Sequence, residues 1–117
     1  MASKRQLQVA ELIKRFFGSV LMEEGYRIFG SGPMVSVTSV QVTPDLSLAR
    51  IFLSIFNSEN KNETLNQIIR YHHVLKQSLA GKVRKHIRRM PELEFFIDDT
   101  LDEMYRLDEL FDHLKKK

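Results

Sequence analysis

The stretch that decides the fold runs from residue 35 to residue 56 and reads VSVTSVQVTPDLSLARIFLSIF. Its first part, Val35–Val42, is rich in β-branched residues, and its last part, Ala49–Phe56, is dominated by apolar ones, as is typical of strands. The residues between them, Thr43–Ser47, read Thr-Pro-Asp-Leu-Ser and favour a turn. Because this loop is short, the two strands are predicted to pair as an antiparallel hairpin.

A helix is predicted before the hairpin. From Lys4 to Glu24, apolar residues recur at the spacing of one helix face. Ser3 is the predicted N-cap and Gly25 the predicted C-terminal end. Gly30–Pro33, which reads Gly-Ser-Gly-Pro, cannot continue a helix and is predicted to be a loop.

Helical periodicity returns after the hairpin and extends from Leu65 to Met90. Gly81 interrupts this long pattern, so we expect a kink or two consecutive helices. Pro91 ends the helical region, and alternating residues 92–98 predict a short third strand. A last helix is predicted after a cap at Asp99 or Thr100. Its apolar face comprises Leu101, Met104, Leu107, Phe111 and Leu114.

These predictions give an α+β chain with the order α-β-β-α-α-β-α, forming a single domain over residues 1–117 with short flexible ends at 1–3 and 115–117. The order α-β-β-α-α-β is that of a type II KH domain, a three-stranded sheet with helices packed on one face. KH domains hold single-stranded nucleic acid with a Gly-x-x-Gly loop between consecutive helices. This chain contains no Gly-x-x-Gly. We therefore expect a KH-like fold without the standard clamp, followed by a C-terminal helix.

The composition excludes several classes of function. The 117 residues include no cysteine, which rules out disulfides, thiolate metal sites and thiol nucleophiles, and suits a reducing, cytoplasmic location. No apolar run approaches the roughly 20 residues of a membrane span. The neighbouring His72 and His73 are expected on different helix faces, where they cannot chelate one ion. We predict no enzyme activity, no metal and no cofactor.

The formal net charge of +3 conceals two opposed segments. Residues 61–91 contain eight Lys or Arg and one acid, whereas residues 92–114 contain nine acids and one base. On a helix passing through Val83, five cations fall opposite the apolar stripe. They are Lys82, Arg84, Lys85, Arg88 and Arg89. A solvated surface is one interpretation, but these cations lack the carboxylates that usually accompany them, which favours contact with a phosphate backbone.

Three sequence blocks resemble a known family. They are residues 5–13 (RQLQVAELI), 37–54 (VTSVQVTPDLSLARIFLS) and 88–101 (RRMPELEFFIDDTL). Together they resemble ribosome-binding factor A, a family of bacterial small-subunit maturation factors with a modified type II KH fold. That family has an Ala-x-Gly kink between its central helices. The aligned stretch here is Tyr71–Leu75, and the nearest pair of small residues is Ala80–Gly81.

The resemblance implies binding to the immature 30S small ribosomal subunit through 16S rRNA, with a non-catalytic role in late maturation and 5′-end processing. It implies no cofactor, a monomer when free, and ribosomal proteins as a second class of partner. Two alternatives stay open: a KH-like module acting on non-ribosomal RNA, and a protein adaptor that uses the acidic C-terminal helix.

The predicted RNA-binding residues come from three parts of the chain. The first helix and the second strand add cations to the five of the basic segment. The full set is Lys82, Arg84, Lys85, Arg88, Arg89, Lys4, Arg5, Lys14, Arg15 and Arg50.

Overall fold

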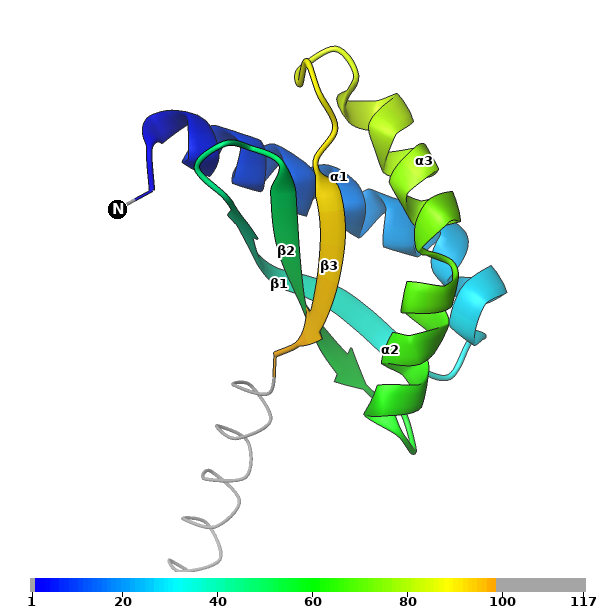
Figure 1. Cartoon of the computed structure of the whole chain (residues 1–117). Helices are drawn as coiled ribbons and strands as arrows, with labels where there is room; N and C mark the ends of the chain where they lie inside the picture. The colour runs from blue at the N-terminus through cyan, green and yellow to red at the C-terminus, as the bar shows by residue number, and fades with distance from the viewer. Residues whose placement is uncertain (1, 99–117) are drawn as a thin grey trace, which may run out of the picture.

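A computed structural model describes residues 2–98 of the chain. Within these residues the elements follow the predicted α-β-β-α-α-β order (Figure 1). They are α1 (Lys4–Phe29), β1 (Met34–Val42), β2 (Leu48–Phe56), α2 (Lys61–Arg70), α3 (His72–Val83) and β3 (Glu92–Ile97). The α+β, KH-like class is confirmed. The predicted C-terminal helix lies outside the described residues.

The predicted hairpin is the centre of a mixed sheet. Strands β1 and β2 pair antiparallel, β2 and β3 pair parallel, and the strand order is β1-β2-β3. In the turn, the Asp45 carboxylate accepts hydrogen bonds from the Ser47 hydroxyl (2.7 Å), the Thr43 hydroxyl (2.8 Å) and the Ser47 backbone N–H (3.1 Å). These donors, led by the Ser47 hydroxyl, lower the pKa of Asp45 to about 2 because they favour its ionised form.

Helix α1 begins where the sequence predicts but ends later. Ser3 is its N-cap and forms a capping box with Gln6, each side chain accepting from the other's backbone N–H. The predicted end at Gly25 is wrong, because the helix continues to Phe29 and is capped by Gly30, with φ at 80°. Gly25 instead makes room for a ring, since a Cβ there would lie 2.7 Å from Phe29 Cζ.

The two consecutive helices are confirmed, but the expected break at Gly81 is wrong. The chain breaks at Tyr71, which separates α2 from α3 and belongs to the stretch where the resemblance led us to expect a kink. Gly81 lies inside α3, exposed, with nothing within 4 Å of where a Cβ would project. A helix tolerates such a glycine at a cost of about 1 kcal/mol.

Helix α3 ends at Val83, so residues 84–91 are not helical. The backbone N–H groups of His86 and Ile87 both donate to the Val83 carbonyl, which turns the chain. Val83 and Ile87 are both buried without a helix between them. Apolar spacing alone therefore misidentified this segment, because a tight turn can bury the same residues as a helix.

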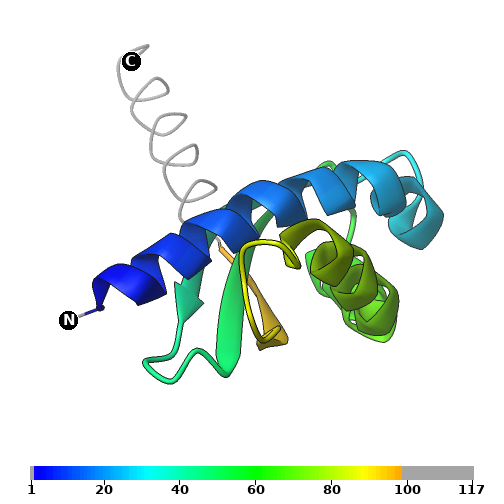
Figure 2. The same ribbon diagram turned by 90° about the horizontal axis from the view of Figure 1, so that it is seen from above.

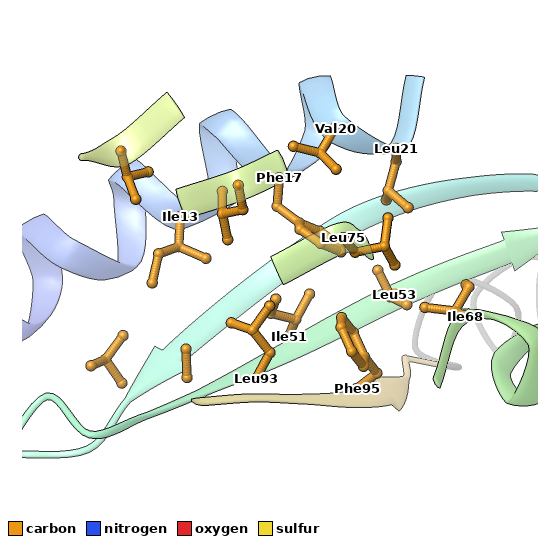
Figure 3. Packing of buried hydrophobic residues seen from close by; sticks show 14 of the residues in the cluster. Ile13, Phe17, Val20, Leu21, Ile51, Leu53, Ile68, Leu75, Leu93 and Phe95 are labelled. Atoms are coloured by element: carbon orange, nitrogen blue, oxygen red, sulfur yellow. The ribbon is translucent and has the colours of Figure 1, made fainter. Parts of the chain in front are cut away.

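The core lies between the sheet and the helices, which cover one of its faces as predicted (Figure 2). In Figure 3, Ile13, Phe17 and Leu21 of α1 point toward the sheet. The Phe17 ring lies 5.6 Å from that of Phe95 on β3. Each fully buried side chain of this size contributes about 1.5–3 kcal/mol relative to an exposed one. This core fixes α1 against the sheet and thereby positions the surface described next.

Candidate nucleic-acid interface

The segment 84–91, which we call the basic loop, packs against α1 through an aromatic contact. The His86 ring stacks on Phe16 of α1 with centroids 5.8 Å apart and an interplanar angle of 22°. The Arg15 guanidinium carbon lies 5.5 Å from the centroid of the same Phe16 ring. In Figure 2 the basic loop, drawn between α3 and β3, runs beside the middle of α1. The loop and the first half of α1 therefore form one continuous surface.

Four cations of the basic loop are exposed and have no carboxylate partner among residues 2–98. None of them forms a salt bridge within residues 2–98. They are Arg84, Lys85, Arg88 and Arg89. Like charges held this close repel one another, and an approaching polyanion relieves that repulsion. Their arrangement suits phosphate groups.

An open groove of about 680 Å³ lies between the first half of α1 and the basic loop. We call it the α1 groove. Its walls combine cations, apolar side chains and one carboxylate. The lining residues are Lys4, Arg5, Leu7, Gln8, Glu11, Leu12, Arg15 and His86. Three of the four cations predicted on the first helix thus share a groove with the loop. Lys14 does not line it, because it lies about 100° around the helix from Arg15.

Two predicted cations are already engaged by carboxylates. Lys82 Nζ lies 2.7 Å from Glu23 Oε1, and its side chain is only 27% exposed, so this pair joins α3 to α1. Arg50 pairs with Glu94 across β2 and β3, with Nε and Oε1 3.5 Å apart. Arg50 alternates with the buried Ala49 and Ile51 and therefore lies on the sheet face away from the helices. The structure does not bring these two residues to the α1 groove.

The expectation of five cations on one helix face is wrong. Helix α3 ends at Val83, so only Lys82 belongs to it, and the other four follow the turn of the basic loop. The Phe16–His86 contact nevertheless holds the loop that carries these four cations against α1. The charge pattern predicted the residues, while the backbone that carries them differs.

Sequence reasoning missed the neutral and acidic lining residues of the groove. Leu7 is one of the apolar residues that recur between Lys4 and Glu24, yet it is 57% exposed. Its angle could have revealed this, because Leu7 lies about 160° around the helix from the buried Val9. Gln8, Glu11 and His86 gave no comparable signal, since only the folded loop brings them to one groove.

No other described feature points to metal chemistry or a membrane. Within residues 2–98 no group of three or more His, Cys, Asp or Glu side chains is placed to hold a metal ion. The rings of His72 and His73 lie 3.9 Å apart, so the expectation that they point apart is wrong, and His72 Nδ1 lies 3.1 Å from the Ile69 carbonyl oxygen. Among the described helices, none is long and apolar enough to cross a membrane.

Comparison with known families accounts for nearly the whole chain. The family model described as "Ribosome-binding factor A" matches residues 5–111. The chain belongs to the ribosome-binding factor A family. Ribosome-binding factor A of Cytophaga hutchinsonii is 36% identical over 110 residues, covering 94% of this chain and 82% of the relative. That of Flavobacterium johnsoniae is 38% identical over 108 residues, covering 92% and 83%.

Solved structures of the same family share this fold. The crystal structure of ribosome-binding factor A from Thermus thermophilus aligns with a TM-score of 0.63 and 24% identity, covering 79% of this chain and 94% of that one. A second match is a homology model of the Thermus thermophilus factor fitted into a cryo-EM map of a 30S complex. It aligns with a TM-score of 0.58 and 27% identity, covering 74% and 88%.

Proposed function

We propose that this protein binds the small ribosomal subunit through the phosphate backbone of 16S rRNA. The surface that makes these contacts, here called the basic surface, comprises Arg84, Lys85, Arg88 and Arg89 of the basic loop with Lys4, Arg5 and Arg15 of α1. The observation that carries the proposal is that Lys4, Arg5 and Arg15 line one groove with His86 of the basic loop. None of the seven cations forms a salt bridge in the described residues. Family membership and the 30S complex of the Thermus thermophilus relative support the choice of partner.

Contacts of this kind position a protein on RNA and carry little base information. Each neutralised phosphate releases condensed counterions, so affinity falls steeply with salt. The protein acts without catalysis in this proposal, by occupying rRNA during late maturation and 5′-end processing of the immature subunit.

Sedimentation with purified immature 30S subunits tests the proposal. Reversing Arg84, Lys85, Arg88 and Arg89 to Glu should abolish association, because four attractive contacts become four repulsive ones. Circular dichroism should show an unchanged fold, since these side chains are exposed. Undiminished association of the folded variant would overturn the proposal.

A gradient of cell lysate, run with and without nuclease, separates the proposal from other partners. Co-migration with small subunits that is lost on nuclease treatment supports rRNA binding. Migration with smaller RNA would point to a non-ribosomal RNA partner, and a complex that survives nuclease to a protein partner. Either of those results would overturn the proposal.

A further inference from the structure

The α1 groove contains more than a phosphate site requires. Two apolar side chains, Leu7 and Leu12, form part of its wall. Leu7 is 57% exposed although it lies among cations. Phosphates gain nothing from apolar contact, whereas the face of an unpaired base does. The groove therefore suits a nucleotide whose base enters it while its phosphates stay on the cationic rim.

His86 provides an aromatic ring on which such a base can stack. Its ring lines the groove and is supported by Phe16, 5.8 Å away and nearly parallel. A supported aromatic ring loses little freedom when a base stacks on it. Stacking of this kind accepts any base, so it favours a single-stranded segment without choosing its sequence.

Glu11 is the acidic residue of the α1 groove. It is the one carboxylate of a groove lined by Lys4, Arg5 and Arg15. Even so, it forms no salt bridge or hydrogen bond within residues 2–98. A carboxylate here weakens phosphate binding unless it accepts hydrogen bonds from the RNA. Its two oxygens are acceptors only, so they match an edge that presents two neighbouring donors.

Guanine is the base with that edge. Its N1–H and N2–H₂ groups lie side by side and can each donate to one oxygen of a carboxylate. Uracil presents a single N–H on the corresponding edge, and adenine and cytosine each present one amino group. Gln8 lines the same groove one turn before Glu11, and its amide can donate to the guanine O6.

We propose that the α1 groove binds one unpaired guanine of a single-stranded RNA segment, stacked on His86 and recognised by Glu11. The inference rests on the proposed function, because the phosphates of the same strand occupy the basic surface. Glu11 then acts as a residue that sets specificity and lowers the affinity for every other base.

The test uses oligouridylates seven nucleotides long whose central nucleoside is uridine, guanosine or inosine. Inosine differs from guanosine only in lacking the N2 amino group. Fluorescence anisotropy with the full chain at about 50 mM salt, where phosphate contacts are strong, gives the affinities. We expect guanine to bind about tenfold more tightly than inosine, the range for a bidentate base contact. Glu11→Gln should remove this preference while leaving the affinity for oligouridylate equal or higher.

Glu59→Gln is the matched control, because it removes the same charge from an exposed loop residue outside the groove. It should keep the preference for guanine. His86→Ala should weaken binding of all three oligonucleotides about tenfold, as loss of one stacking contact does.

Three results would overturn the inference: equal binding of the guanine and inosine oligonucleotides, a guanine preference that survives in Glu11→Gln, or no binding of the guanine oligonucleotide. Sedimentation with 30S subunits is a separate readout. Subunit binding without guanine preference defeats this inference alone. Guanine preference without subunit binding defeats the proposed function alone.

Discussion

The two sides of the sheet carry similar residue types but use them differently. On the helix side, the basic loop and α1 present cations that have no carboxylate partner in the described residues, beside a Phe16–His86 stack. On the face away from the described helices, Arg50 is paired with Glu94, beside a stack of Phe52 on Phe96 with centroids 5.3 Å apart. A cation and an aromatic ring thus occur on both sides.

The difference teaches that a cation is available to RNA only where the fold leaves it without a carboxylate. Carboxylate partners lie 2.6–3.5 Å from four other cations of the described residues, Arg27, Arg50, Lys76 and Lys82. The field of each is largely cancelled by its partner. The four cations of the basic loop keep their full field, which is why we propose that RNA binds at this loop.

The largest expected effect comes from neutralising the unpaired cations. Changing Arg84, Lys85, Arg88 and Arg89 to Gln should weaken binding to 30S subunits about a hundredfold or more. The slope of log affinity against log salt, which is negative, should become less negative by about 3, because each phosphate contact contributes about −0.7 to it. Binding titrations at several salt concentrations measure both quantities.

The matched control replaces the four paired cations by Gln. They are Arg27, Arg50, Lys76 and Lys82. The change in net charge is the same, yet the salt slope should stay close to that of the wild type. Each exposed ion pair contributes only about 0–1 kcal/mol to stability, so the control should remain folded. Equal losses of binding in both variants would mean that net charge alone determines binding, and that the absence of a carboxylate partner does not matter.

A smaller effect is expected at the aromatic pair on the sheet face away from the described helices. Phe96 is 39% exposed and stacks on Phe52, its partner in the β2–β3 register. Phe96→Ala should lower the free energy of unfolding by about 1 kcal/mol, the scale of such a pair, and leave 30S binding unchanged. Denaturant titration and sedimentation provide the two measurements. Loss of subunit binding in the folded variant would show that this face of the sheet also contacts RNA.

The smallest effect concerns Asp45, an exposed carboxylate whose hydrogen-bond donors are neutral hydroxyls and a backbone N–H. Its pKa of about 2 lies below the ordinary 3.8, so its ionised form stabilises the folded state above pH 4 or so. That contribution is lost as the pH falls from about 4 to about 2. Asp45→Asn should therefore be less stable than the wild type at neutral pH.

Urea denaturation of the wild type and of Asp45→Asn at about pH 7, 4 and 2.5 measures the difference in stability between them. This difference should shrink toward the lowest pH. Added salt should change it little, because no cation takes part in the turn. A difference that stays constant over the whole pH range would mean that the turn does not depend on ionised Asp45.

Much of the fold was predictable because its signals are local. The β-branched run before Thr43 and the turn residues through Ser47 predicted the hairpin, and Ser3 predicted the start of α1. The glycines were less informative. Gly25 and Gly81 both lie inside helices. Gly25 makes room for the Phe29 ring, and Gly81 faces open space. A glycine shows that a helix can end, and only its neighbours decide whether it does.

The candidate site was predictable as a set of residues and not as a shape. The basic segment and the first helix supplied Arg84, Arg88 and Arg15 in advance. That Lys82 and Arg50 would meet carboxylates was not predictable, because Glu23 and Glu94 are distant in the sequence and reach them only through packing. The same holds for Glu11 beside His86 in the α1 groove.

The amino-acid sequence by itself determined the order of the elements, the hairpin with its Asp45 turn, and the segregation of basic and acidic segments. These depend on propensity, periodicity and composition, which act over a few residues. Tertiary structure alone decided which cations remain without a partner and where the groove opens. Those outcomes depend on contacts between α1, α3 and the basic loop, and on how burial of Val83 and Ile87 directs the chain between them.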